Sequence, residues 1–198
     1  MRDLNERGKS QISLLYDPFR RSCRAIGGVH SHTPGMMQSP QISFTKMQGT
    51  GNDFLVLDNR SIQFSVDGLS AFAAQWCPRR YGVGADGLLA LDHPETSAAD
   101  YRMLYVNADG SRATMCGNGA RCLFRFAQRQ GFEADELAFD TDAGLYRAAS
   151  VAEGDRVRLF VPEVSDLQDK PVLDRGQPEA IEALFFVHSG TEHLVARV

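Results

Sequence analysis

The sequence predicts an α+β fold in which an antiparallel or mixed sheet packs against helices. Short apolar segments recur from residue 42 onward and are separated by tight turn signals instead of long crossovers, which favours antiparallel or mixed pairing. Residues 120–130 form a helical pattern that is apolar over most of its girth, as in a helix packed against a sheet on several sides. The length of 198 residues suits one large domain, or one domain and part of another.

The first elements precede residue 79. Residues 42–47 alternate in polarity and indicate a short strand, and residues 54–57 are continuously apolar, which indicates a buried strand. The glycine-rich segment 49–53 is expected to form the loop between them. An amphipathic helix is expected over residues 68–77, because apolar residues recur there at helical spacing, and Pro78 ends it.

A second glycine-rich loop, at residues 81–87, leads into a strand expected at residues 88–91. Residues 101–106 indicate a further strand, and the sequence NADG at residues 107–110 is a strong turn signal. The helix at residues 120–130 follows, and Gly131 is placed to end it as a C-cap glycine.

The remaining pattern predicts strands and a change of domain. Three short strands are expected at residues 137–139, 145–149 and 157–161, and two more at residues 184–187 and 194–198. Prolines and charges between these groups are typical of a linker. We therefore divide the chain into four segments, which are an N-terminal extension expected to be disordered (1–40), a first domain (41–161), a linker (162–180) and the opening strands of an incomplete second domain (181–198).

Composition excludes several classes of protein. With 43% apolar and 23% charged residues, the chain is not of a disordered or low-complexity type, and its net charge of −4 argues against nucleic acid as the main partner. No stretch approaches the ~18 apolar residues of a membrane span, so no membrane partner is expected. Residues 1–35 are basic but lack a secretion signal, so a cytoplasmic protein is expected, with Met36 or Met37 as alternative starts.

The four cysteines suggest one functional thiol and no zinc site. Cys23, Cys77, Cys116 and Cys122 lie at irregular spacings without a Cys-x-x-Cys pair, so we expect reduced thiols and no metal. Cys122 lies six residues after Cys116, which turns it away by about 240° on a helix, so Cys122 is expected in the core. Cys77 is expected in the core as part of its own helix. His30 and His32 have no third ligand nearby and are expected to be solvated.

Cys116 is distinguished by the residues directly after it. The glycines of the sequence CGNG at residues 116–119 let the first backbone N–H groups of the helix approach a ligand, and these groups have no partner inside a helix. They carry partial positive charge, which favours a substrate carboxylate or a thiolate. Cys116 is therefore a candidate base or nucleophile; the alternative from these residues alone is a buried cysteine before an ordinary helix.

Four motifs together resemble the diaminopimelate epimerase family. They are FTKMQGTGNDF at residues 44–54, GVGADG at 82–87, YVNADGS at 105–111 and MCGNGARC at 115–122. The two glycine-rich loops precede strands and so do not fit the strand–loop–helix order of a dinucleotide site. The resemblance begins near residue 42 and implies two pseudo-symmetric α+β halves, each a curved sheet wrapped around a central helix. This chain would contain the first half and the start of the second.

The resemblance also implies which residues form the site. The catalytic cysteine of the family's first half falls on Cys116, and Gly117 and Asn118 fall where backbone donors hold the substrate α-carboxylate. Asn52 and Asn107 fall on substrate-binding positions. Thr191 stands where many members have asparagine in the sequence GNPH, and it still offers a hydrogen-bond donor; Glu192 after it departs from the pattern.

The activity implied is an isomerase reaction without a cofactor. One thiolate removes the α-proton of LL-diaminopimelate and a thiol on the opposite face returns one, giving the meso isomer for lysine and peptidoglycan synthesis. The partner is thus a small-molecule substrate, and a homodimer stays open. The second cysteine and a Glu–Arg pair are expected beyond Val198, so this chain alone is expected to be inactive. The alternatives are a proline-racemase-type amino-acid isomerase and a non-catalytic ligand-binding or partner module that retains the first domain.

Overall fold

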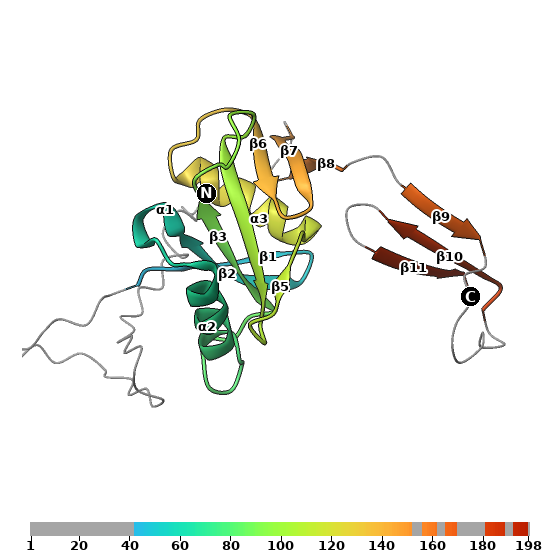
Figure 1. Ribbon diagram of the computed structural model, residues 1–198, viewed down its shortest axis with the longest axis horizontal. Coiled ribbons are helices and arrows are strands. Elements are labelled where there is room, and N and C mark those ends of the chain that lie inside the picture. The colour runs from blue at the N-terminus through green and yellow to red at the C-terminus, as the bar shows by residue number, and fades with distance from the viewer. Residues whose placement is uncertain (1–41, 152–155, 162–164, 170–180, 189–191, 198) are drawn as a thin grey trace, which may run out of the picture.

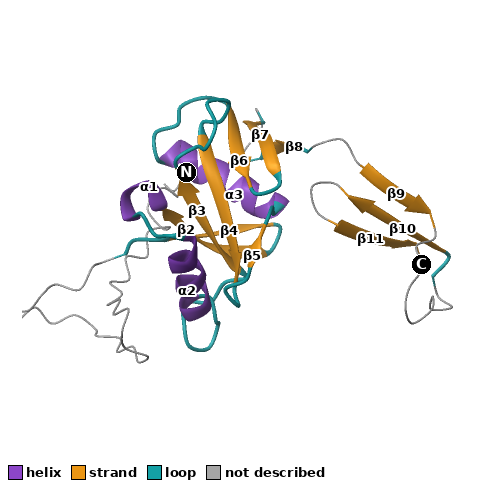
Figure 2. Cartoon of the chain, viewed as in Figure 1, coloured by secondary structure: helices purple, strands orange, loops and turns teal. Residues whose placement is uncertain are grey.

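The computed structural model describes residues 42–151, 156–161, 165–169, 181–188 and 192–197 (Figure 1). Strands dominate these segments (Figure 2). The first sheet runs in the order β1-β2-β3-β4-β6-β7-β8, with the short β5 paired to β4 beyond the end of β6. Its strands are β1 (Thr45–Gly49), β2 (Asn52–Asp58), β3 (Gly87–Asp92), β4 (Tyr101–Asn107), β5 (Arg112–Ala113), β6 (Glu136–Thr141), β7 (Gly144–Ser150) and β8 (Val157–Phe160).

The sheet is mixed, as the turn pattern predicts. Pairs β2–β3 and β4–β6 are parallel and the other pairs are antiparallel. Parallel neighbours need a crossover, and each crossover here contains a helix. The first holds α1 (Asn59–Ile62) and α2 (Val66–Trp76), and the second holds α3 (Gly117–Arg129). Successive side chains of a strand point to opposite faces of the sheet, so a continuously apolar strand places apolar side chains on both faces.

Each face of the sheet forms its own core. Phe54 and Val56 of β2 belong to the cluster that surrounds α3, whereas Leu55 and Leu57 belong to the cluster that surrounds α2. The same alternation occurs on β3, where Leu89 and Leu88 belong to opposite clusters. The two helices thus cover opposite faces, which Figure 1 shows around the central strands.

The sheet curves around α3. This helix contacts β1 and β8, which are the two outermost strands of the first sheet's path, as well as β2, β3, β4 and β7 between them. A single helix reaches both outer strands only when the sheet bends around it. The predicted α+β class with a curved mixed sheet around a central helix is confirmed.

Most predicted elements occur within two or three residues of their expected bounds. The predicted helix at 68–77 is α2, and Gly131 has φ +97° just after α3, as a helix-ending glycine requires. The expected loop at 49–53 is shorter than predicted, because Thr50 and Gly51 alone make the turn between β1 and β2 with φ values of 58° and 83°. The short helix α1 was not anticipated; Asp58 caps it by accepting a hydrogen bond from the Arg60 backbone.

A second sheet of three antiparallel strands contains β9 (Ser165–Asp169), β10 (Ala183–His188) and β11 (Glu192–Arg197), in the order β11-β10-β9. Strands β10 and β11 match the strands predicted there. Strand β9 lies within residues 162–180, where the sequence predicts a linker; its sequence SDLQD has one apolar residue and so lacks a strand pattern. The predicted division into domains, including disorder in 1–40, is otherwise not tested by the described residues.

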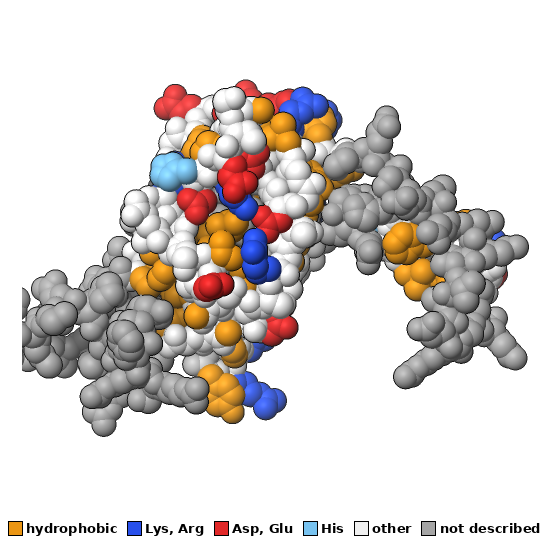
Figure 3. Space-filling view, viewed as in Figure 1, with side chains coloured by type: hydrophobic (Ala, Val, Ile, Leu, Met, Phe, Trp, Pro, Cys, Tyr) orange, Lys and Arg blue, Asp and Glu red, His pale blue; other side chains and the backbone are white. Residues whose placement is uncertain are grey.

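The surface of the described chain mixes charges of both signs. On the face in Figure 3, acidic and basic side chains lie interspersed. Asp142, for example, pairs with Arg102 at 2.6 Å and with Arg112 at 2.7 Å. Among the described residues, no helix is both long and apolar enough to cross a membrane.

Candidate functional site

Cys116 is the N-cap of α3. Its backbone is extended (φ −144°, ψ 115°), and its Sγ accepts a hydrogen bond from the Gly119 backbone N–H at 3.4 Å. Its carbonyl accepts the Ala120 N–H at 2.8 Å, which starts the helix. The N–H groups of Gly117 and Asn118 have no hydrogen-bond partner among the described residues. The first turn therefore presents a half-buried thiol beside two free backbone donors.

Gly117 and Gly119, the two glycines of this turn, differ in how much space surrounds them. A Cβ at Gly119 would lie 2.8 Å from Leu89 Cδ2 and 3.3 Å from Met103 Cε, so the absence of a side chain lets α3 pack closely on the sheet. A Cβ at Gly117 would meet nothing closer than Leu159 Cδ2 at 3.6 Å, which is ordinary contact. Packing thus explains Gly119 and does not explain Gly117, which borders the free donors.

The β1–β2 hairpin brings Asn52 to the thiol. A Cβ at Gly49 would lie 3.0 Å from the Asn118 carbonyl oxygen, so the hairpin rests directly against the first turn of α3. Asn52 is the first residue of β2 after the turn. Its Oδ1 lies 3.7 Å from Cys116 Sγ and 3.4 Å from Asn118 Nδ2. Three predicted site residues, Asn52, Cys116 and Asn118, are therefore in contact although 64 residues separate the first two.

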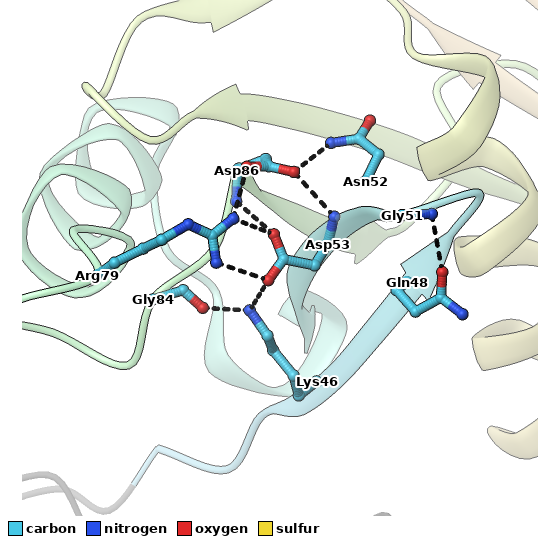
Figure 4. Close-up of polar contacts among 8 residues, drawn as sticks. All are labelled: Lys46, Gln48, Gly51, Asn52, Asp53, Arg79, Gly84 and Asp86. Carbon is cyan, nitrogen blue, oxygen red and sulfur yellow. Dashed lines mark hydrogen bonds and ion pairs between the residues drawn. The ribbon is translucent and has the colours of Figure 1, made fainter.

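A network of ion pairs contacts Asn52 through Asp86 (Figure 4). Arg79 contacts Asp53 at 2.6 Å and Asp86 at 2.7 Å, and Lys46 reaches the other oxygen of Asp53 at 2.7 Å. Asp86 accepts from Asn52 Nδ2 at 2.8 Å and from the Asp53 N–H at 3.0 Å. The Arg79 guanidinium holds the pKa of the Asp53 carboxyl far below its usual range, and the Asn52 amide is the main cause of a lowered pKa at Asp86.

Arg121 orients the second asparagine of the site. One turn into α3, its guanidinium donates to Asn118 Oδ1 and, at 3.1 Å, to Thr50 Oγ1 on the hairpin. The side chain therefore joins the first turn of α3 to the β1–β2 turn. This contact also leaves Asn118 Nδ2 directed at Asn52.

Asn107 is hydrogen-bonded within its own turn. It pairs with Gly87 across β3 and β4, and its Nδ2 donates to Ser111 Oγ at 3.0 Å within the turn that follows β4. Asn107 lies two residues after Tyr105 on β4, so the two side chains point to the same face of the sheet. Tyr105 and Cys116 both pack against the cluster around α3, so Asn107 is on the face of the sheet where Cys116 lies. Among the described residues, no hydrogen bond joins Asn107 to the other predicted site residues. Thr191, the remaining predicted residue, lies outside the described part of the chain.

The other described cysteines are unlike Cys116. Cys77 and Cys122 are buried, and burial raises the pKa of each thiol to about 11. All three thiols are free. The expectation that Cys122 belongs to the core and does not pair with Cys116 is confirmed.

Sequence reasoning missed four polar residues of this region, namely Arg79, Asp86, Thr50 and Arg121. Two of them have a recognisable place in the sequence. Asp86 lies in the second glycine-rich loop as Asp53 lies in the first, and Arg79 is one of two adjacent arginines just before that second loop. The pairing itself depends on the register of β2 with β3, in which Phe54 lies beside Gly87. Local sequence patterns do not contain that information.

Tyr105 shapes the site next to Gly87. A Cβ at Gly87 would lie 2.7 Å from Tyr105 Cε2 and 2.7 Å from the Val106 carbonyl oxygen, so this conformation excludes any larger residue. The ring also meets Phe54 edge-on, with centroids 6.0 Å apart. Burial is the main cause that raises the pKa of Tyr105 to about 12, and the nearby Cys116 adds to it. Tyr105 is therefore a neutral ring beside the thiol.

The arrangement can bind an anion and exchange a proton. Two free N–H groups at a helix start suit a carboxylate, and a half-buried thiol beside them is a group that can take or give a proton. Among the residues that the structure describes, no three His, Cys, Asp or Glu side chains gather as metal ligands.

Comparison with known proteins identifies relatives of this chain. The family model of diaminopimelate epimerase matches residues 44–164. The diaminopimelate epimerase of Thermosynechococcus vestitus is 48% identical over 142 residues, which cover 71% of this chain and 44% of the relative. That of Aquifex aeolicus is 35% identical over 163 residues, covering 79% and 57%. The chain spans about half the length of the curated relatives it matches.

Solved structures share the fold at low identity. A probable proline racemase from Agrobacterium radiobacter superposes with a TM-score of 0.52 at 18% identity, covering 79% of this chain and 52% of that one. A hydroxyproline epimerase from Agrobacterium vitis gives 0.50 at 15% identity, covering 77% and 50%. These likenesses concern the fold alone. The match to the family model over most of the first sheet and α3, with relatives at 35–48% identity, shows that this chain belongs to the diaminopimelate epimerase family.

Proposed function

We propose that the protein epimerises LL-diaminopimelate to meso-diaminopimelate without a cofactor, and that Cys116 is one of two thiols that exchange the α-proton. The observation that carries the proposal is the first turn of α3. There Cys116 Sγ lies 3.7 Å from Asn52 Oδ1 and adjoins two N–H groups that have no partner among the described residues. A carboxylate bound by those two N–H groups would bring the neighbouring α-carbon next to the sulfur.

The chemistry explains why such a site is needed. The α-proton of an amino acid is weakly acidic, so its removal requires a base held at the reacting carbon and donors that stabilise the charge developing on the carboxylate. In the proposed step, the thiolate of Cys116 takes the α-proton and becomes a thiol, and the electron pair of the C–H bond stays on the substrate. A second thiol on the opposite face then gives its proton to the carbanion. The reverse reaction exchanges these two roles.

The second thiol is not one of the other described cysteines. Cys77 and Cys122 are buried, and a pKa of about 11 leaves almost no thiolate of either at neutral pH, so neither can take a proton in the reverse step. Cys122 also packs in the cluster around α3 and near Gly49, within the core. We therefore expect the opposite face of the substrate to be completed from elsewhere in the protein.

The remaining assignments belong to the same proposal. Gly117 and Asn118 would hold the α-carboxylate, and Asn52, Asn107 and Thr191 would contact the substrate. Residues 41–161 would form the first domain of an enzyme that acts in the cytoplasm in lysine and peptidoglycan precursor synthesis. Residues 181–198 would belong to the second domain.

The test is isomerisation in deuterated water with the longest natural form of the protein and no added cofactor. We expect LL-diaminopimelate to give the meso isomer with deuterium at the α-carbon, and we expect proline to remain unchanged. Exchange into proline instead of diaminopimelate would favour a proline-racemase-type enzyme. Binding of diaminopimelate without exchange would contradict catalysis and favour a ligand-binding module.

A further inference from the structure

The carboxamide of Asn52 lies between a carboxylate and the thiol of the proposed site. On one side its Nδ2 donates to Asp86 Oδ2 at 2.8 Å (Figure 4). On the other side its Oδ1 faces Cys116 Sγ at 3.7 Å and Asn118 Nδ2 at 3.4 Å. The two ends of this side chain thus meet partners of opposite character. Which end faces the thiol decides whether Cys116 meets a hydrogen-bond acceptor or a donor.

Asp86 permits only one orientation of this amide. An ionised carboxylate has no proton to donate, so the group against it must be the NH₂ end of the amide. Asp86 stays ionised because Asn52 Nδ2, the Asp53 N–H and Arg79 all donate to it, which lowers its pKa. Arg79 binds the oxygen of Asp86 that Asn52 does not use, at 2.7 Å, and so fixes the plane of the carboxylate.

An independent contact imposes the same orientation from the other side. The guanidinium of Arg121 is a donor without acceptor capacity, and it contacts Asn118 Oδ1. Asn118 must therefore present its NH₂ end to Asn52, whose oxygen accepts it at 3.4 Å. Reversing Asn52 would set NH₂ against NH₂ on one side and oxygen against carboxylate on the other. Charges at both ends, Asp86 and Arg121, thus fix the two amides.

We infer that Asp86, held by Arg79, is a positioning residue that directs the Asn52 amide oxygen, a hydrogen-bond acceptor, at the Cys116 thiol of the resting site. This inference rests on the proposed function, in which Cys116 exchanges a proton. The Gly119 N–H at the start of α3 donates to the same sulfur. The sulfur therefore has an acceptor on one side and a donor on the other, which suits a group that both gives and takes a proton.

The test measures how fast iodoacetamide alkylates Cys116 at pH 7, because only the thiolate reacts. Four proteins are compared by peptide mass spectrometry: wild type, Asp86→Asn, Asn52→Ala and the double variant. Asp86→Asn removes the carboxylate that holds the NH₂ end of Asn52 and leaves only the contact with Asn118, so the amide can turn its NH₂ end to the sulfur part of the time. We therefore expect alkylation about three- to tenfold faster when Asn52 is present, as loss of one hydrogen bond implies.

The double variant separates positioning from charge. Removing the Asp86 charge acts through space in both backgrounds, whereas the effect of amide orientation exists only when Asn52 is present. In the Asn52→Ala background we therefore expect Asp86→Asn to change the rate less than about twofold. An equal fold-change in both backgrounds would overturn the inference. Asp109→Asn is the matched control, because it removes a carboxylate bonded to Ser111 without touching Asn52, and it should leave the rate within about twofold.

A measurement on wild type does not depend on the folding of any variant. The side-chain NH₂ protons of Asn52 should show a nuclear Overhauser effect to the Asp53 amide proton, since both groups donate to Asp86 Oδ2, and none to the β-protons of Cys116. An effect to the Cys116 β-protons would overturn the inference. Neither experiment needs turnover, so a coupling found in a protein that fails to epimerise diaminopimelate would contradict the proposed function and leave the positioning intact.

Discussion

The first turn of α3 has two sides, and they differ in whether their side chains and N–H groups are packed and hydrogen-bonded or left accessible. On the side toward the sheet, Gly119 allows contact with Leu89, and Cys122 is buried in the core. On the other side, Cys116 is half-buried and Gly117 has room for a side chain, with Leu159 Cδ2 of β8 as the nearest atom to its Cβ position at 3.6 Å. Residues of one short motif therefore serve two purposes. The packed side holds the helix in place, and the open side keeps donors and a thiol available to a ligand.

The largest expected difference between the two sides is thiol reactivity. At pH 7 we expect iodoacetamide to alkylate Cys116 at least about 100-fold faster than Cys77 or Cys122, because burial both raises the pKa of those two thiols to about 11 and blocks access. Peptide mass spectrometry of a time course gives the three rates. Comparable rates at Cys116 and Cys122 would erase the distinction between the two sides.

A change on the packed side should lower stability. Gly119→Ala places a methyl group 2.8 Å from Leu89 Cδ2 in the core, and such overpacking should reduce the free energy of unfolding by about 2 kcal/mol. Urea denaturation followed by circular dichroism measures it. The matched control is Gly117→Ala, which should leave stability within about 0.5 kcal/mol because its Cβ has ordinary contacts only.

On the open side, the same substitution should act on catalysis. We expect Gly117→Ala to lower kcat/KM for LL-diaminopimelate by about tenfold, because the added methyl group lies beside the N–H groups proposed to hold the carboxylate. The measurement is the initial rate at which LL-diaminopimelate gives the meso isomer, with the longest natural form of the protein. An unchanged kcat/KM would mean that the substrate does not approach the first turn this closely.

The smallest expected effect concerns the ion pairs that support the open side. The lowered pKa of Asp53 means that its ion pairs stabilise the fold above its unfolded pKa of about 4 and that this contribution is lost as the pH falls further. Asp53→Asn should therefore lower the free energy of unfolding by about 1 kcal/mol at pH 7, and this deficit should shrink toward pH 3. Urea denaturation across this pH range checks it, and a deficit that grows on acidification would have the wrong sign.

Much of the fold can be predicted from local patterns, because burial imposes them. The continuously apolar runs of β2 and β3 exist because both faces of these strands contribute to a core, and the helical spacing on α2 exists because one face of that helix does. Strand β9 is not predicted, because SDLQD contains too few apolar residues to show a strand period. The local sequence also places Cys116 at a helix start, and the resemblance to a known family adds Asn52 and Asn118.

The support behind the site was not predictable in the same way. Asp86 meets Asn52 only because β2 and β3 pair in parallel with Phe54 beside Gly87, and Arg79 reaches both acids from the loop after α2. Contacts between residues 34 positions apart depend on register, which is set by the whole sheet. Gly117 and Gly119 also look equivalent in the sequence, and only their neighbours in the fold distinguish them.

The most direct test of the account compares Cys116→Ser with Cys122→Ser in solvent deuterium exchange at the α-carbon of diaminopimelate, using the longest natural form of the protein. A serine hydroxyl is a far weaker acid than a thiol, so Cys116→Ser should slow exchange by at least about 1,000-fold. Cys122→Ser should leave kcat within about threefold in the fraction that folds, because Cys122 is buried in the cluster around α3. Exchange at the wild-type rate in Cys116→Ser would contradict the account.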